Sequence, residues 1–177
     1  MHEARIDEAD GHRVAADNGW FILNVRELPW FTCEGHGTWC GFESLNAPST
    51  MLGIGIHVLS PGEAPGFYHD ESDQEGFLVL SGECVVVVEG EERRMGPWDY
   101  FHCPPWTKHI TVGAGAEPCA ILMVGTRSPH HRIRYHVEPA AARHGFSVAA
   151  YTDDAATAYR DRPPIVPAAG PAYPPPP

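Results

Sequence analysis

Two histidines and two glutamates give this sequence its clearest sign of chemistry. His69, Glu71 and Glu75 lie just before an apolar run, and His109 follows a turn of two prolines. Residues i and i+2 of an extended chain point the same way, so His69 and Glu71 share a face. Glu75 joins them if the intervening loop re-enters in register, and His109 begins another strand. Two imidazoles and two carboxylates with an open position suit a divalent ion of iron, manganese, zinc or nickel.

Short apolar runs with turn residues between them must position these four side chains. In Met51 to Leu59 the apolar residues alternate with Gly53, Gly55 and His57, which predicts a strand with one apolar and one open face. His57 then lines an interior cavity; a satisfied or exposed histidine is the alternative. Further strands are predicted at Phe77 to Leu80, Cys84 to Glu89, Glu91 to Met95, Tyr100 to Cys103, His109 to Val112 and Cys119 to Gly125. Short antiparallel strands at this spacing indicate an all-β sandwich or barrel.

The regions on either side of these strands have a different character. Residues 1–19 are polar and unpatterned, which predicts a loose arm, and Trp20 to Val25 reads as a strand. Short helices are predicted at Pro139 to His144 and Ala155 to Arg160, packed on the outside of the barrel, before a proline-rich, solvated tail. The sequence thus divides into an arm (1–19), a barrel domain (20–127) and a C-terminal extension (128–177).

Composition excludes some partners. The net charge of −11 over 177 residues argues against a surface for phosphate backbones or anionic membranes. No apolar run is long enough for a membrane span, and the start of the sequence lacks the basic and apolar regions of a signal peptide. We therefore expect a soluble, cytoplasmic protein. Its five cysteines show no CxxC spacing, which predicts reduced core thiols, and a Cys33–Cys40 bridge is expected only in an oxidising compartment.

The central stretch resembles the two sequence motifs of the cupin superfamily. The first motif is a glycine, a spacer, His-x-His, a glutamate and a glycine; the second is a glycine, a proline turn and a histidine. The matching positions are Gly62, His69, Glu75 and Gly82 for the first motif, and Gly96, Pro104 and His109 for the second. The resemblance covers about Leu52 to Gly125. It implies a small jelly-roll β-barrel, usually dimeric, with a metal inside.

This sequence departs from the cupin pattern at two informative positions. Glu71 occupies the place of the second histidine, so the resemblance implies a metal set of His69, Glu71, Glu75 and His109. Trp106 stands where a glycine is expected, beside the mouth of the pocket. The alternative is a barrel that has lost its metal, with its glutamates solvated or paired to Arg93 or Arg94. His130, His131, His136 and His144 lie outside the motifs and are predicted to be solvated.

These features favour a metal-binding cupin, a metalloenzyme of dioxygenase or isomerase type acting on a small oxygenated organic molecule. Glu71 is the candidate catalytic group, as a fourth ligand or a general base. His57, Tyr100 and Trp106 are the pocket candidates. A non-catalytic small-molecule-binding or sensing barrel and a purely structural barrel are the competing classes. We also expect a homodimer, because the run CVVVV lacks polar alternation and must be covered on both faces, by a second sheet or a second subunit.

Overall fold

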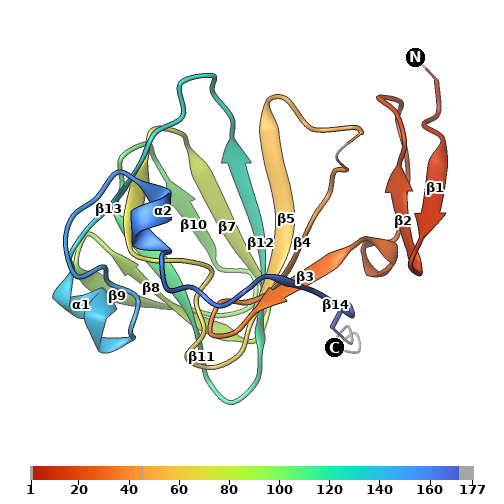
Figure 1. Cartoon of the computed structure of the whole chain (residues 1–177). Helices are drawn as coiled ribbons and strands as arrows, with labels where there is room; N and C mark the ends of the chain where they lie inside the picture. Colours follow the sequence, from red (N-terminus) through yellow and green to blue (C-terminus); the bar gives the residue numbers. More distant parts are fainter. Residues whose placement is uncertain (1, 45, 172–177) are drawn as a thin grey trace.

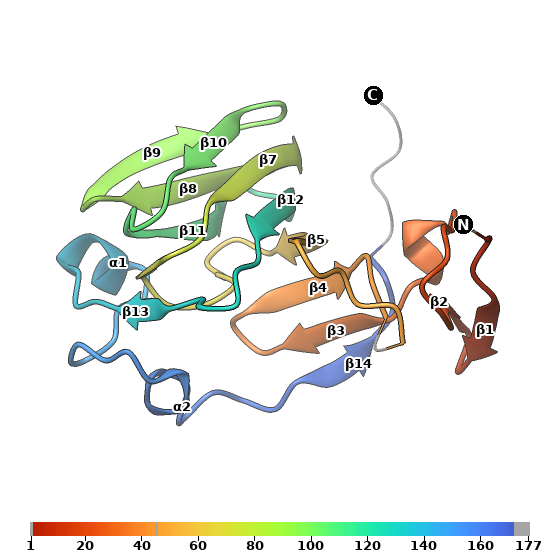
Figure 2. The same cartoon turned by 90° about the horizontal axis from the view of Figure 1, so that it is seen from above.

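Two antiparallel sheets face each other and enclose the core of the protein (Figures 1 and 2). The structure, a computed structural model, describes residues 2–44 and 46–171. This part contains fourteen strands, two short α-helices and one 3-10 helix. The all-β fold with a short C-terminal helical extension is confirmed, while the end of the proline-rich tail, residues 172–177, lies outside the described residues.

The larger sheet has seven strands in the order β10-β7-β12-β5-β4-β3-β14. Their bounds are β3 Trp30–Cys33, β4 Gly37–Gly41, β5 Leu52–Leu59, β7 Glu75–Ser81, β10 Tyr100–Cys103, β12 Cys119–Thr126 and β14 Val166–Ala168. The second sheet has five strands in the order β13-β6-β11-β8-β9. These are β6 His69–Glu71, β8 Glu83–Val88, β9 Glu91–Met95, β11 His109–Ala114 and β13 Ile133–Tyr135.

The main core lies between the two sheets. Phe77 and Val79 from β7 pack against Cys84 and Val86 from β8. Val87 points the other way, and Ala140 and Ala141 of α1 (Pro139–Arg143) cover it. The CVVVV strand is therefore covered on both faces within one chain, and its lack of polar alternation needs no second subunit.

The N-terminal arm is more ordered than its sequence suggested. Strands β1 (Ile6–Ala9) and β2 (His12–Ala15) form a hairpin that stands apart from the two large sheets (Figures 1 and 2). The two turn residues, Asp10 and Gly11, both have positive φ, as a tight hairpin turn requires. The strand predicted at Trp20 to Val25 is wrong. Trp20 makes only an isolated bridge, and the Asn24 side chain caps a 3-10 helix at Val25–Glu27.

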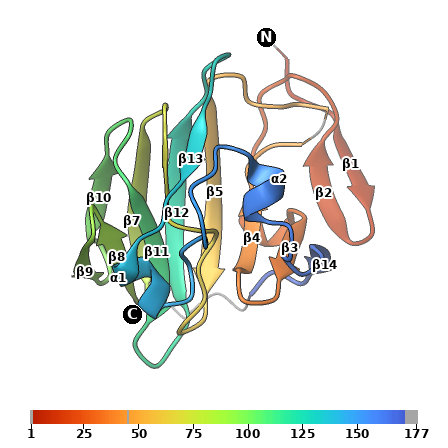
Figure 3. The same ribbon diagram turned by 60° about the vertical axis from the view of Figure 1, so that its left-hand side comes forward.

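The C-terminal extension returns to both sheets. Strand β13 pairs with β6, and β14 pairs with β3 at the edge of the other sheet. Between them, α2 (Ala155–Ala158) lies in front of the sheets in Figures 1 and 3. The Asp154 carboxylate caps its N-terminus by accepting hydrogen bonds from the backbone N–H groups of Ala156 and Thr157. Part of the predicted tail is thus a paired strand. Within the described residues, no helix is long and apolar enough to cross a membrane.

Candidate metal centre

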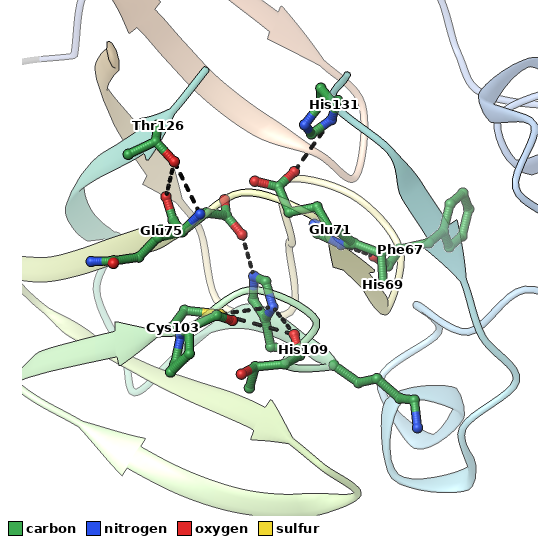
Figure 4. A network of polar contacts seen from close by, with 12 residues as sticks. Phe67, His69, Glu71, Glu75, Cys103, His109, Thr126 and His131 are labelled. Carbon is green, nitrogen blue, oxygen red and sulfur yellow. Dashed lines mark hydrogen bonds and ion pairs between the residues drawn. The ribbon is translucent and has the colours of Figure 1, made fainter. Parts of the chain in front are cut away.

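His69, Glu75 and His109 meet between the two sheets (Figure 4). Each places one ligand atom within 4.8 Å of the others. His69 and His109 begin β6 and β11 and stand directly opposite each other, so their side chains share the inner face of the five-stranded sheet. Glu75 begins β7 in the facing sheet. Hydrogen bonds between Gln74 and Thr126 hold the loop that leads to Glu75. The strand pairing therefore creates the cluster.

Backbone carbonyls determine which nitrogen of each histidine carries the proton. His69 Nδ1 donates to the carbonyl of Phe67 at 2.7 Å, and His109 Nδ1 donates to the carbonyl of Thr107 at 3.0 Å. A carbonyl oxygen only accepts hydrogen bonds, so Nδ1 holds the hydrogen and Nε2 of the neutral ring has a free lone pair. Both rings are thus prepared in the tautomer that binds a metal through Nε2.

Glu75 and His109 require a positive charge between them. Glu75 Oε2 lies 3.2 Å from His109 Nε2, close enough for an ion pair, yet without hydrogen-bond geometry it is a buried acceptor with no donor. Two lone pairs facing each other repel, unless a proton or a metal ion lies between them. Burial opposes protonation of His109, but its contacts with Cys103 and Glu75 outweigh burial and raise its pKa to about 10. A metal ion would replace that proton.

Burial also shifts the pKa values of the other two titratable groups of the site, His69 and Glu71. Burial and the positive charge of His109 lower the pKa of His69 to about 4, so His69 is neutral at pH 7. Burial and the neighbouring charge of Glu75 raise the pKa of Glu71 to about 7. Glu75 behaves in the opposite way: burial alone would raise its pKa, but the contact with His109 lowers it. The pKa of the Glu71 carboxyl is therefore raised, whereas that of Glu75 is lowered.

Glu71 lies beside the three-residue cluster rather than in it. Its Oε2 is 3.6 Å from His131 Nε2, and His131 Nδ1 hydrogen-bonds the buried Asp73 at 2.8 Å (Figure 4). His131, predicted to be solvated, thus contacts a residue of the site, although 44% of its side chain remains exposed. Neither Arg93 nor Arg94 reaches these glutamates, since Arg93 pairs with Glu91 and Arg94 with Glu83.

The geometry of the centre agrees with a family comparison. The family model described as "Cupin domain" matches residues 55–125. This part of the chain is a cupin domain. The match contains the three clustered residues and Glu71, and it ends before His131.

Three relatives of the cupin domain show how far the likeness extends. Gentisate 1,2 dioxygenase 1 from Aquipseudomonas alcaligenes is 33% identical over 79 residues, which are 44% of this chain and 22% of that protein. A sugar phosphate isomerase from Silicibacter pomeroyi is 28% identical, with a TM-score of 0.46 over 49% of this chain and 56% of that one. The polyketide cyclase RemF from Streptomyces resistomycificus is 18% identical, with a TM-score of 0.48 over 54% of this chain and 69% of that one. This chain thus spans about a fifth of the dioxygenase's length.

The three pocket candidates occupy different places in the cupin domain. His57 faces the interior from β5, opposite the buried Ile121. Tyr100 is 59% exposed, and its phenol ring covers Gly76 on the outer face of the sheet, so it does not line the interior. Trp106 lies at the rim, where it lines a hollow of about 350 Å³ and the guanidinium of Arg134 stands 4.2 Å from its ring centroid.

Sequence reasoning missed two groups that the fold brings to the cupin site. Tyr135 of β13 stands opposite His69 across the strand pair and is 2% exposed. Cys103 Sγ lies 3.4 Å from His109 Nδ1. Cys103 lies in a predicted strand, whose alternation could have signalled an inward-facing thiol, but Tyr135 and His131 come from beyond the motifs and have no local signal.

Proposed function

We propose that His69, Glu75 and His109 bind a divalent metal and that the cupin domain is a dioxygenase-type metalloenzyme acting on a small oxygenated organic molecule. The observation that carries the proposal is the arrangement of three donor groups within 4.8 Å of one another, in which both histidines bond a backbone carbonyl through Nδ1 and one buried Glu75 oxygen is unsatisfied. Two histidines and one carboxylate with open positions are the set that non-haem iron(II) oxygenases use. The similarity to the gentisate dioxygenase supports the same reading.

The bound metal would supply a Lewis acid with open positions for oxygen ligands. The protein's own part is to hold the three ligands rigidly and to keep water out of a core-lined space. Glu71, which His131 contacts on the side away from the three ligands, is proposed as the group that accepts or returns a proton at its carboxylate oxygen. A homodimer, a cytoplasmic location and the absence of nucleic-acid or membrane partners stay predictions.

Metal analysis of the purified protein tests the central claim. After anaerobic loading with iron(II) and removal of excess metal, wild type should hold about one ion per chain. His69→Ala/His109→Ala should hold almost none, because it removes both imidazoles. His130→Ala is the matched control, since His130 is an exposed histidine of the same chain, and it should load like wild type. Equal, low metal in wild type and the double variant would refute the proposal.

The same measurement separates the two roles considered for Glu71. Glu71→Gln should keep the metal content near that of wild type, because Glu71 contacts His131 and lies outside the three-residue cluster. Oxygen uptake with gentisate as a trial substrate then tests catalysis. Full metal binding without turnover of any aromatic diol would favour the non-catalytic binding module instead.

A further inference from the structure

His57 is a partly buried polar residue that the metal centre does not use. Its cross-strand neighbours are Ile121 in β12 and Trp39 in β4, and Ile121 is fully buried in the core between the sheets. Opposite residues of an antiparallel pair project from the same face, so His57 and Trp39 also face inward. Their side chains point toward the facing five-stranded sheet, which carries His69 and His109.

The imidazole of His57 lacks the partner that a buried histidine normally has. Its Nδ1 is buried without a hydrogen bond, and within residues 2–44 and 46–171 no hydrogen bond reaches either ring nitrogen. Burial lowers the pKa of His57 to about 4, so the ring is neutral at pH 7 and can donate one hydrogen bond and accept another. Buried polar groups are nearly always satisfied, so an orphaned one points to a bound water or ligand.

The imidazole of His57 stacks on the indole of Trp39. The two rings lie almost parallel, with centroids 6.1 Å apart and planes inclined by 13°. Two residues before His57 on the same face, Gly55 lets β4 approach closely, because a Cβ there would collide with the Cys40 carbonyl oxygen. Across the interior, Tyr135 packs beside His69 with centroids 6.1 Å apart, and Tyr159 meets Tyr135 edge-on.

Several rings near His57 and the metal centre are only partly buried. His57, Trp39, His69 and Tyr159 each keep part of their surface accessible. Val79 and Ile121, nearer the β7 side, have no accessible surface. A planar ligand placed here would therefore meet aromatic rings, a residue of the metal centre and one unsatisfied imidazole.

We propose that His57, stacked on Trp39, determines substrate specificity by hydrogen-bonding an oxygen substituent of a planar, phenol-type ring. The inference rests on the proposed function, because the same ring would present its oxygen atoms to the metal centre. A flat ring can stack on the Trp39–His57 pair, and a phenolic hydroxyl both donates and accepts, as the neutral imidazole requires. A saturated ring with the same hydroxyl groups is thicker and loses the stacking contact.

The experiment compares catechol with trans-1,2-cyclohexanediol, which has the same two hydroxyl groups on a non-planar ring. Binding is measured by isothermal titration calorimetry, in zinc-loaded protein and in protein stripped of metal. Wild type should bind catechol at least about tenfold more tightly than the diol in both forms. His57→Phe, which keeps the ring and removes both nitrogens, should weaken catechol binding by roughly three- to tenfold. His57→Gln, which keeps a donor and an acceptor, should stay closer to wild type.

Thermal unfolding distinguishes a ligand-binding histidine from a structural one. His57→Phe should melt at or above the wild-type temperature without ligand, because it removes an unsatisfied buried nitrogen. His36→Phe is the matched control. His36 is also buried among aromatic rings, but its Nδ1 hydrogen-bonds the carbonyl of Ala64 at 3.1 Å, so this variant should melt lower. If His57→Phe fails to fold, the smaller His57→Leu replaces it.

Two results would overturn the proposal. Equal affinity of wild type and His57→Phe for catechol would show that His57 does not contact the ligand. Equal affinity of wild type for catechol and the diol would remove the planar substrate class. A chain that binds no metal would refute the proposed function alone, because the titration of metal-free protein does not depend on it.

Discussion

The inward-facing histidines of this protein differ in which ring nitrogen has a hydrogen-bond partner and which is left without one. His69 and His109 each donate from Nδ1 to a nearby backbone carbonyl, which leaves Nε2 for a cation. His36 is satisfied by Ala64 and surrounded by aromatic rings. His57 is partly buried, and its buried Nδ1 has no hydrogen bond. Residue type and burial are thus similar, and the hydrogen-bond partner separates ligand, structural and pocket roles.

The lowered pKa of His57 predicts a measurable pH dependence of stability. Its pKa is about 4 in the folded protein and about 6.5 when unfolded, so between these values only the unfolded chain binds the proton. Acidification therefore favours the unfolded state, and stability falls as the pH drops below 6.5. Between pH 7 and 5, metal-free wild type should lose about 2 kcal/mol more than His57→Phe in urea denaturation. Equal losses would show that His57 is charged in the folded protein.

At the residue scale, the sequence predicted which face of a strand a side chain occupies better than it predicted which residues that side chain contacts. Alternation correctly placed His69 and His109 on inner faces, because each strand's register is set by its apolar residues. It could not show that Glu71 contacts His131, since the loop carrying His131 has no periodicity. Nor could spacing place Tyr100, whose strand turns it outward while its neighbour Phe101 packs against Phe77.

At the element scale, the short helices of the C-terminal extension contribute to the packing of the barrel and of its site. Helix α1 covers the outer face of β8, a role that the sequence had left to a second sheet or subunit. Helix α2 ends at Tyr159, whose hydroxyl accepts a hydrogen bond from Phe67 N at 3.4 Å and whose ring packs against that of Phe67. Phe67 is also the residue whose carbonyl holds His69. The α2 contact therefore supports a predicted ligand through one intermediate residue.

Gly66 makes the docking of α2 testable. A Cβ at Gly66 would lie 2.4 Å from the Tyr159 oxygen, so Gly66→Ala must displace Tyr159. We expect a loss of about 1–3 kcal/mol in the free energy of unfolding. Tyr159→Phe in the same chain should recover part of it, because the next ring atom is at an ordinary 3.6 Å.

Gly41→Ala is the control for Gly66→Ala, because a Cβ at Gly41 meets no atom within 4 Å. It should change stability by less than about 0.5 kcal/mol. Chemical denaturation of the four proteins measures these differences. A Gly66→Ala variant as stable as Gly41→Ala would show that α2 does not pack on the barrel.

The success of prediction also varied among elements. From Met51 to Gly125 every predicted strand is present, because each run is bounded by turn residues and has a clear apolar pattern. Before residue 51 the pattern is dense in glycine, proline and tryptophan, and strands β3 and β4 were not resolved from it. Their formation depends on pairing with β5, which is a tertiary effect.

At the scale of the whole molecule, the extension joins elements that are far apart in the sequence. Arg134 of β13 makes hydrogen bonds of 2.8 and 2.6 Å to Asp70, a carboxylate with no accessible surface beside His69. No local pattern predicts this pair, because its two members are 64 residues apart. The family match ends at residue 125, so the paired arginine lies outside the matched residues.

Truncation tests whether the predicted boundary at residue 127 separates an independent barrel from its extension. Ending the chain after Arg127 removes helix α1, which covers the buried Val87, Ile110 and Val112. It also removes Arg134, the arginine that pairs with the Asp70 carboxylate. Exposing these buried apolar side chains and losing the Arg134–Asp70 pair removes a large share of the roughly 5–15 kcal/mol that stabilises a typical domain. We therefore expect fragment 1–127 to lose cooperative thermal unfolding, as followed by circular dichroism.

The control fragment, 1–162, lacks β14 but keeps β13, α1 and α2. It should still unfold cooperatively, at a temperature above that of fragment 1–127 and below that of the full chain. Val166 and Pro167 of the edge strand β14 are exposed, and the loss is limited to the packing of Ala168 against the Trp30 cluster. A fragment 1–127 that melts like the full chain would show that the barrel is complete without its extension. In that case the pairing of Arg134 with Asp70 would serve the site beside His69 rather than the stability of the fold.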